Sequence, residues 1–160
     1  MNKEEFKNIY DNYFDAIRNY IFYKSGNTDI ATDITQEAFI KIWEKQVVFN
    51  PQKNKSLLYK IAGDLFINYI RHKKVETNYL SGIKFSFVND SLNNNIEYKE
   101  LKKNYEVILL RLSEKQRIVF LMSRNEELSY KEIADRLNIS VKAVEKRMSK
   151  ALVELRTVLK

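Results

Sequence analysis

Residues that interrupt helices are nearly absent from this chain, and their scarcity limits its fold more than any other feature. The 160 residues include only three glycines and one proline. Apolar residues recur at spacings of three and four, which is the pattern of an amphipathic helix and not the alternation of a strand. The sequence therefore predicts an all-α protein.

Apolar stripes at helical spacing predict three helices in the first half of the chain. The stretch Ser25-Gly26-Asn27 is a suitable stop for the first helix, and Asn50-Pro51 marks a turn before the third. Three such stripes can be buried against one another, so we expect residues 1–74 to form one bundle. The predicted helices span residues 3–24, about 28–45 and about 55–73.

Helical periodicity fails after the third helix. Residues 75–95 include a polar, turn-rich run at 89–95, which is typical of a flexible linker. Helical spacing then returns in four further segments, so we expect two small helical domains, residues 1–74 and 96–160, joined by this linker. The four segments are residues 96–112, 114–125, 129–137 and 140–157.

The charge of the chain favours a polyanionic partner. Its 28 Lys and Arg exceed its 21 Asp and Glu, for a formal net charge of +7. Nucleic acid and an anionic membrane surface both fit this balance. The first twenty residues lack the apolar stretch of a secretory signal, and no window approaches the roughly 20 apolar residues of a membrane span. We therefore expect a cytoplasmic protein.

Groups suited to catalysis are few. The chain has no Cys, and His72 is its only histidine, so thiolate zinc sites and Ser/His/Asp or Cys/His machinery lack their components. The phosphate-binding pattern G-x-x-x-x-G-K-[ST] is also missing. We expect no enzymatic activity, no metal site and no cofactor.

The strongest local signal lies at residues 128–145 and predicts a helix-turn-helix. Ser129 followed by Glu132 makes a capping box, and Ser140 can cap the second helix. Asn138 tolerates the left-handed backbone that a short turn between the helices requires. An ordinary helical hairpin with a solvated basic face is the alternative, although two caps and a short turn together favour DNA binding.

The second helix of this unit would present a basic face to a major groove. At about 100° per residue, an apolar stripe from Val141 to Leu155 leaves its lysines on the opposite side. Lysines can meet phosphates or guanine acceptors, whereas Glu145 would either accept from a cytosine amine or form a structural salt bridge. The candidate DNA-binding residues of the unit are Ser129, Lys131, Lys142, Ala143, Glu145, Lys146, Arg147, Ser149 and Lys150.

The second helix of the first bundle has a mixed outer face. Its expected core stripe consists of Ala31, Ile34, Ala38, Phe39 and Ile42. The opposite face combines acids, an amide and apolar groups, a mixture that suits a protein partner better than DNA. A partly buried Trp43 at the edge of the core, beside solvated acids, is the alternative. The residues of this outer face are Asp33, Gln36, Glu37, Ile40 and Trp43.

Two segments resemble the sigma-70 family of bacterial RNA polymerase factors, and their order and spacing are those of its extracytoplasmic-function group. DITQEAFIKIWE at 33–44 resembles the polymerase-binding helix, and LSEKQRIVF at 112–120 resembles the C-terminal domain. The resemblance implies that the outer face of residues 33–43 docks on the polymerase β′ subunit and that the C-terminal domain contacts the β subunit. It also implies that the helix-turn-helix binds the minus-thirty-five element and that an anti-sigma factor is a further partner.

The third predicted helix resembles the segment with which this family binds and opens the minus-ten element. Residues 53–74 carry six basic groups against only Asp64, which suits phosphate neutralisation. The loop at 49–55 lies where the family captures a flipped base, which needs a platform or pocket. Tyr59 fits core packing as well as base contact. The candidates are Asn50, Lys53, Lys55, Tyr59, Lys60, Asn68 and Arg71.

The sequence thus predicts a sigma factor that binds core RNA polymerase, opens promoter DNA and directs transcription initiation. An autonomous helix-turn-helix regulator, with an N-terminal bundle that binds a partner or small effector, is the alternative. Such a regulator would need neither the mixed outer face nor two separate basic faces.

Overall fold

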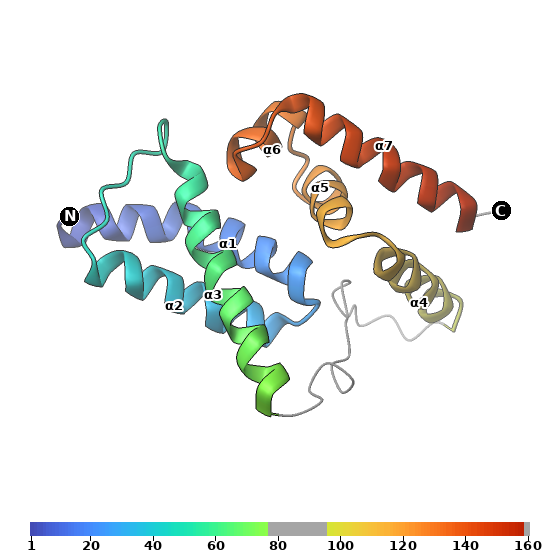
Figure 1. Cartoon of the computed structure of the whole chain (residues 1–160), viewed down its shortest axis with the longest axis horizontal. Coiled ribbons are helices and arrows are strands. Elements are labelled where there is room, and N and C mark those ends of the chain that lie inside the picture. The colour runs from blue at the N-terminus through green and yellow to red at the C-terminus, as the bar shows by residue number, and fades with distance from the viewer. Residues whose placement is uncertain (77–95, 159–160) are drawn as a thin grey trace.

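The computed structural model describes residues 1–76 and 96–158, and these two stretches contain seven helices and no strand (Figure 1). The predicted all-α fold is confirmed. Helix α3 continues to Glu76, and the rest of the predicted linker lies outside the described residues. The first domain comprises α1 (Lys3–Ser25), α2 (Thr28–Glu44) and α3 (Lys55–Glu76), and the second comprises α4 (Ile96–Arg111), α5 (Glu114–Asn125), α6 (Tyr130–Leu137) and α7 (Val141–Val158).

Helix α2 forms the centre of the first domain because its predicted stripe packs against both α1 and α3. All five residues of that stripe are buried. The Phe39 ring lies 5.2 Å from that of Tyr10 and 5.8 Å from that of Phe14, so aromatic side chains fill the space between α1 and α2. Thr35 is buried as well, which the apolar pattern did not predict, and its hydroxyl donates to the Ala31 carbonyl at 2.6 Å.

Helices α6 and α7 form the predicted helix-turn-helix. Ile133 and Ala134 on α6 pack toward α7, where Val144 and Met148 are buried. Asn138 adopts the predicted left-handed conformation, with φ 55° and ψ 49°, and its N–H donates to the carbonyl of Ala134. The turn therefore needs no glycine, because an asparagine tolerates this backbone conformation.

The caps of the helix-turn-helix differ from the prediction in one detail. Ser140 caps α7, since its Oγ accepts from the N–H of Ala143 at 3.0 Å. Ser129 caps α6 in the same way through the N–H of Glu132 at 3.1 Å. The Glu132 carboxylate, however, accepts from the Ser129 hydroxyl and not from its backbone N–H. The Ser129 hydroxyl thus both accepts from the Glu132 N–H and donates to the Glu132 carboxylate. The second bond replaces the one that the predicted capping box places between the Glu132 carboxylate and the Ser129 N–H.

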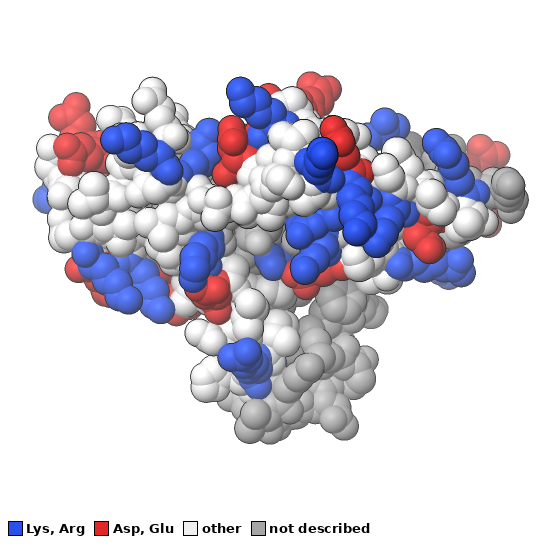
Figure 2. All heavy atoms as spheres, turned by 45° about the horizontal axis from the view of Figure 1, so that its top comes forward, with Lys and Arg blue, Asp and Glu red and all other residues white. Residues whose placement is uncertain are grey.

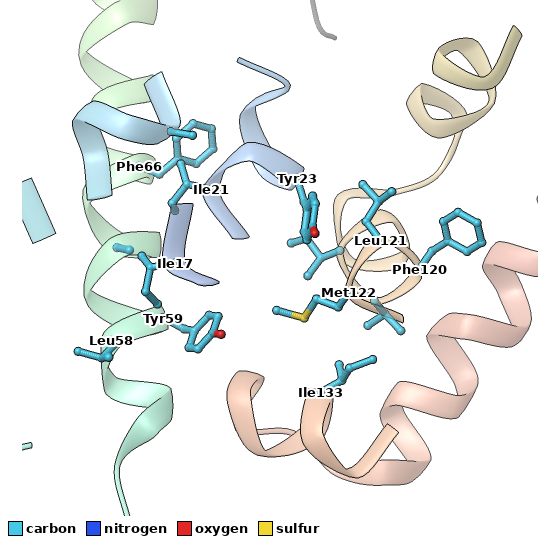
Figure 3. Packing of buried hydrophobic residues seen from close by; sticks show 14 of the residues in the cluster. Ile17, Ile21, Tyr23, Leu58, Tyr59, Phe66, Phe120, Leu121, Met122 and Ile133 are labelled. Atoms are coloured by element: carbon cyan, nitrogen blue, oxygen red, sulfur yellow. The ribbon is translucent and has the colours of Figure 1, made fainter. Parts of the chain in front are cut away.

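The two domains pack against each other through α1 with α5 and α3 with α6. Figure 3 shows Tyr23 on α1 and Tyr59 on α3 pointing toward Leu121 and Met122 of α5. The buried apolar residues of both domains form one continuous cluster. In the part of the chain that the structure describes, no helix combines the length and apolar character needed to cross a membrane.

Candidate nucleic-acid and partner-binding surfaces

Helix α2 carries the predicted partner-binding residues on the side opposite its buried stripe, here called the α2 outer face (Asp33, Gln36, Glu37, Ile40 and Trp43). The two acids and the amide are exposed, and Ile40 is 54% exposed. Trp43 is only partly exposed because its ring lies 5.2 Å from that of Phe6 on α1. Trp43 therefore closes the edge of the core and also borders the outer face.

The loop before α3 is held together by its own asparagines. The Asn54 side chain accepts from the N–H of Asn50 at 2.6 Å and donates to the carbonyl of Val48 at 2.8 Å. The Asn50 side chain in turn accepts from the N–H of Gln52 at 2.9 Å. Asn50, a predicted minus-ten residue, thus fixes the loop through its oxygen. A cleft of about 370 Å³ lies between this loop and the start of α1.

The outer side of α3 presents the predicted phosphate-binding groups. Lys60, Asn68 and Arg71 are all exposed. Lys60 forms an ion pair with Asp64 one turn further on, at 2.9 Å, with both side chains largely in solvent. An exposed pair of this kind contributes little to stability, so exchange of Asp64 for a phosphate oxygen would cost little.

Tyr59 has a different environment from the other predicted minus-ten residues. It is 3% exposed and its ring packs edge-on to that of Tyr20 at 5.1 Å. Its hydroxyl accepts from the Arg136 guanidinium at 3.0 Å. Burial raises the pKa of Tyr59, and the nearby Arg136 acts in the opposite direction. While the domains are packed in this way, Tyr59 is an interdomain packing residue and is not accessible to nucleic acid.

The helix-turn-helix exposes its predicted basic face. In Figure 2, Lys and Arg side chains gather to the right of the middle of the view, with some acidic side chains among them. Glu145 forms no ion pair within the described residues, so its carboxylate remains available and the structural salt bridge is not observed. Of the predicted residues, Ala143 and Arg147 are partly exposed, and Ser129, Lys131, Lys142, Glu145, Lys146, Ser149 and Lys150 are exposed.

Packing of the domains brings two of the predicted nucleic-acid surfaces together. A cleft of about 560 Å³ has Lys53 of the α2–α3 loop and Lys55 at the start of α3 on one side, and Asp135 and Asn138 of the helix-turn-helix on the other. The α2 outer face contributes no residue to this cleft. The predicted minus-ten loop and the helix-turn-helix are thus neighbours in this arrangement, while the predicted protein-binding face lies apart from their contact.

A polar network that sequence reasoning missed joins the domains at the same interface. The Tyr23 hydroxyl donates to the Glu126 carboxylate at 3.1 Å. Arg136 lies 3.4 Å from the other oxygen of Glu126 and also donates to Tyr59. Burial raises the pKa of Glu126, an effect that Arg136 and the hydrogen bond from Tyr23 partly offset. These four residues, Tyr23, Tyr59, Glu126 and Arg136, are called the interdomain network below.

Arg117 forms a second polar link, between α5 and the end of α1. It is 8% exposed, and its Nε donates to the carbonyl of Tyr23 at 2.8 Å while a terminal nitrogen lies 3.4 Å from the carbonyl of Lys24. Carbonyls in the last turn of a helix have no N–H donor within that helix, so Arg117 supplies donors that the helix itself lacks. The sequence did contain a signal, because Arg117 lies one turn before Phe120 and Leu121 on a buried stripe, where a guanidinium requires acceptors.

Glu126 should give the protein a distinct pH dependence of stability. Because its pKa is raised, the carboxyl group of Glu126 holds its proton more tightly in the folded chain than in the unfolded chain. As pH rises from about 4.5 through the raised pKa, this group loses its proton and the buried charge destabilises the fold. We expect the stability of wild type relative to Glu126→Gln to be greater at pH 5 than at pH 7. Urea unfolding of both proteins across this range tests this, and parallel stability curves would contradict it.

Comparison with known proteins gives matches over both domains. Residues 9–75 match the model of sigma-70 region 2, and residues 102–155 match that of sigma-70 region 4. The ECF RNA polymerase sigma factor SigW of Bacillus subtilis is 31% identical over 99% of this chain and 90% of its own length. RNA polymerase sigma factor YlaC of the same species is 26% identical over 96% of this chain and 91% of its own.

Solved structures show the same fold. The sigma factor RpoE from Bartonella quintana, in complex with the anti-sigma factor NepR, superposes with a TM-score of 0.68 at 23% identity, over 98% of this chain and 97% of its own. CnrH in complex with the cytosolic domain of CnrY gives a TM-score of 0.65 at 19% identity, over 99% and 89% of the two chains. The arrangement of helices is therefore shared across both domains.

Proposed function

Because this chain belongs to the extracytoplasmic-function group of the sigma-70 family and directs RNA polymerase to promoters, we propose how its parts divide that task. Residues 1–74 bind core RNA polymerase and the minus-ten element, residues 75–95 connect the domains, and residues 96–160 bind the minus-thirty-five element as duplex. The protein acts by binding, without a catalytic step or cofactor, in the cytoplasm where the polymerase works.

The observation that carries the polymerase assignment is the composition of the α2 outer face. Its acids and amide are exposed beside an apolar Ile40 that is 54% exposed. An apolar centre with polar neighbours is the anatomy of a protein interface. Acidic groups would repel DNA, so this face is better suited to the β′ subunit of the polymerase than to the promoter.

A pull-down with purified core RNA polymerase from the same bacterium tests this assignment. We expect the triple variant Asp33→Ala, Gln36→Ala, Glu37→Ala to lose retention by the polymerase, because it removes three polar contacts at once while leaving the buried stripe of α2 intact. A matched control removes similar exposed groups from α1, namely Glu4→Ala, Asn12→Ala, Asp15→Ala. This control should bind as wild type does.

Two outcomes of this pull-down would count against the proposal. Equal retention of both triple variants by the polymerase would show that the α2 outer face is not part of the polymerase interface. Failure of wild type to bind any core polymerase would favour the autonomous helix-turn-helix regulator. Circular dichroism of each variant ensures that lost binding is not lost folding.

For the minus-ten element, we propose that the exposed basic groups of α3 and its preceding loop neutralise promoter phosphates, with Asn50 beside the flipped base. Support comes from the exposure of Lys53, Lys60 and Arg71. Tyr59 can join them only after the domains separate, since it is buried against Arg136 in the packed form. A contact between Tyr59 and promoter DNA would therefore require release of α6 from α3.

For the minus-thirty-five element, we propose that α7 lies in the major groove with Lys142, Lys146 and Lys150 toward the DNA. Support comes from the exposure of these lysines opposite the buried Val144 and Met148. Glu145, which forms no ion pair within the described residues, is proposed to accept from a cytosine amine. The C-terminal domain is also proposed to contact the polymerase β subunit.

An anti-sigma factor is proposed as a further partner. Of the solved structures that share this fold, the sigma factor RpoE is bound to the anti-sigma factor NepR, and CnrH is bound to the cytosolic domain of CnrY. A partner that favours the packed arrangement would keep Tyr59 and the cleft beside Lys53 away from promoter DNA.

A further inference from the structure

A second interdomain cleft lies apart from every surface assigned above. It has a volume of about 620 Å³ and is bordered by α1, the start of α2, α4 and α5. None of the proposed polymerase-binding or DNA-binding residues lines it. Small-molecule sites commonly have volumes of roughly 300 to 1,000 Å³ and favour domain boundaries. The residues that give the cleft its chemical character are Arg18, Asn19, Tyr105, Arg124 and Asn125.

Each domain contributes one guanidinium group to this cleft. Arg18 of α1 donates through Nε to the hydroxyl of Thr32 at 2.9 Å, which holds the side chain in place, and it forms no ion pair within the described residues. Arg124 of α5 lies close enough to Tyr105 to lower the pKa of that phenol against the raising effect of burial. Across residues 1–76 and 96–158, Arg124 too forms no ion pair.

The cleft also contains one carboxylate, from Glu126. That carboxylate accepts from the hydroxyl of Tyr23 and lies beside the guanidinium of Arg136, which partly offset its charge. Among the described residues, no acid forms an ion pair with Arg18 or Arg124, so both guanidinium groups remain as positive charges in the cleft. Such a lining attracts anions.

We propose that this cleft binds a small phosphate-bearing molecule, held by Arg18 from one domain and Arg124 from the other. A phosphate has enough acceptor oxygens for two guanidinium groups, and the planar fork of each Arg matches them in pairs. Asn19 and Asn125 also line the cleft. The proposal does not depend on the roles assigned to the α2 outer face or the helix-turn-helix.

Binding at this position would favour the packed arrangement of the domains. The two guanidinium groups belong to different domains, so they meet one ligand only while α1 and α5 are in contact. A ligand that binds one state alone stabilises that state by an amount that grows with the logarithm of its concentration above Kd. A phosphate-bearing metabolite would thereby oppose the separation that frees Tyr59.

Isothermal titration of the full chain with inorganic pyrophosphate, at fixed ionic strength, tests the proposal. We expect binding to wild type and at least a tenfold loss of affinity in Arg18→Gln and in Arg124→Gln. The matched control Arg156→Gln removes an exposed arginine of α7 outside the cleft and should bind as wild type does. Arg18→Lys retains the charge without the fork and should bind more weakly than wild type.

Several outcomes would overturn the proposal. An equal loss in Arg156→Gln would indicate general attraction of an anion to a basic protein. Absence of binding to wild type at millimolar pyrophosphate would remove the site altogether. Citrate, a carboxylate of comparable charge, should bind more weakly, and equal affinity would remove the preference for phosphate. Circular dichroism establishes that each variant is folded before titration.

Discussion

Reversal of charge at Lys146 and Lys150 should reduce the affinity of the protein for minus-thirty-five duplex by about a hundredfold at 0.1 M salt. Both lysines are exposed on α7, opposite its buried stripe. Each phosphate contact contributes a slope of roughly −0.9 to the dependence of log K on log salt, so two lost contacts account for nearly two orders of magnitude. The introduced glutamates add repulsion, and the salt dependence should become less steep by about two units or more.

Fluorescence anisotropy with labelled promoter duplex at several salt concentrations measures both quantities for the variant Lys146→Glu, Lys150→Glu. The control Lys99→Glu, Lys103→Glu makes the same change at the same spacing on exposed positions of α4. It should retain most of the wild-type affinity. An equal loss of DNA affinity in the control would show that net charge, and not the position of the lysines on α7, causes the effect. Loss of polymerase binding in the α7 variant would contradict the division of labour between the domains.

Replacement of Arg117 by Met should separate the two domains without unfolding either one. The guanidinium donates to the carbonyls of Tyr23 and Lys24 at the end of α1. Hydrogen bonds to charged groups contribute about 1.5 to 3 kcal/mol each, so the loss of both should shift the packing equilibrium toward separated domains by at least about a hundredfold. Water can replace the lost donor once the domains part, and Met retains a high helix propensity.

Small-angle scattering should show a larger radius of gyration for Arg117→Met, and hydrogen exchange should be faster in the last turn of α1. The control Lys115→Met changes an exposed basic residue two positions earlier in α5 and should behave as wild type does. An unchanged radius of gyration would show that Arg117 does not hold the packed arrangement. Lost helical content would show that it supports the fold of its own domain instead.

Helices and their faces could be predicted from the sequence because local rules determine them. A period near 100° per residue placed Ala38 and Phe39 inside and Glu37 outside, since only one side of α2 can pack against its neighbours. The same rule was less accurate at two positions of the stripe on α7. Val141 and Leu152 are 40% and 37% exposed, although the pattern placed them on the apolar side, because no neighbouring helix covers those positions fully.

The contacts between domains could not be predicted because periodicity indicates that a residue is buried but not what covers it. Tyr23 and Glu126 are 103 residues apart in the sequence and meet at 3.1 Å. Tyr59 fitted both core packing and base contact, and only the position of Arg136 places it against the other domain. The cleft lined by Arg18 and Arg124 could not be predicted for the same reason, since its lining residues come from both domains.

The link from Arg117 to the end of α1 also orders events during synthesis. The N-terminal domain leaves the ribosome first, and its three-helix core consists of contacts that are short in sequence and therefore quick to form. The carbonyls of Tyr23 and Lys24 face water until residue 117 has been added. Each newly made molecule thus passes through a stage in which the N-terminal domain is folded and Tyr59 has not yet been covered by α6.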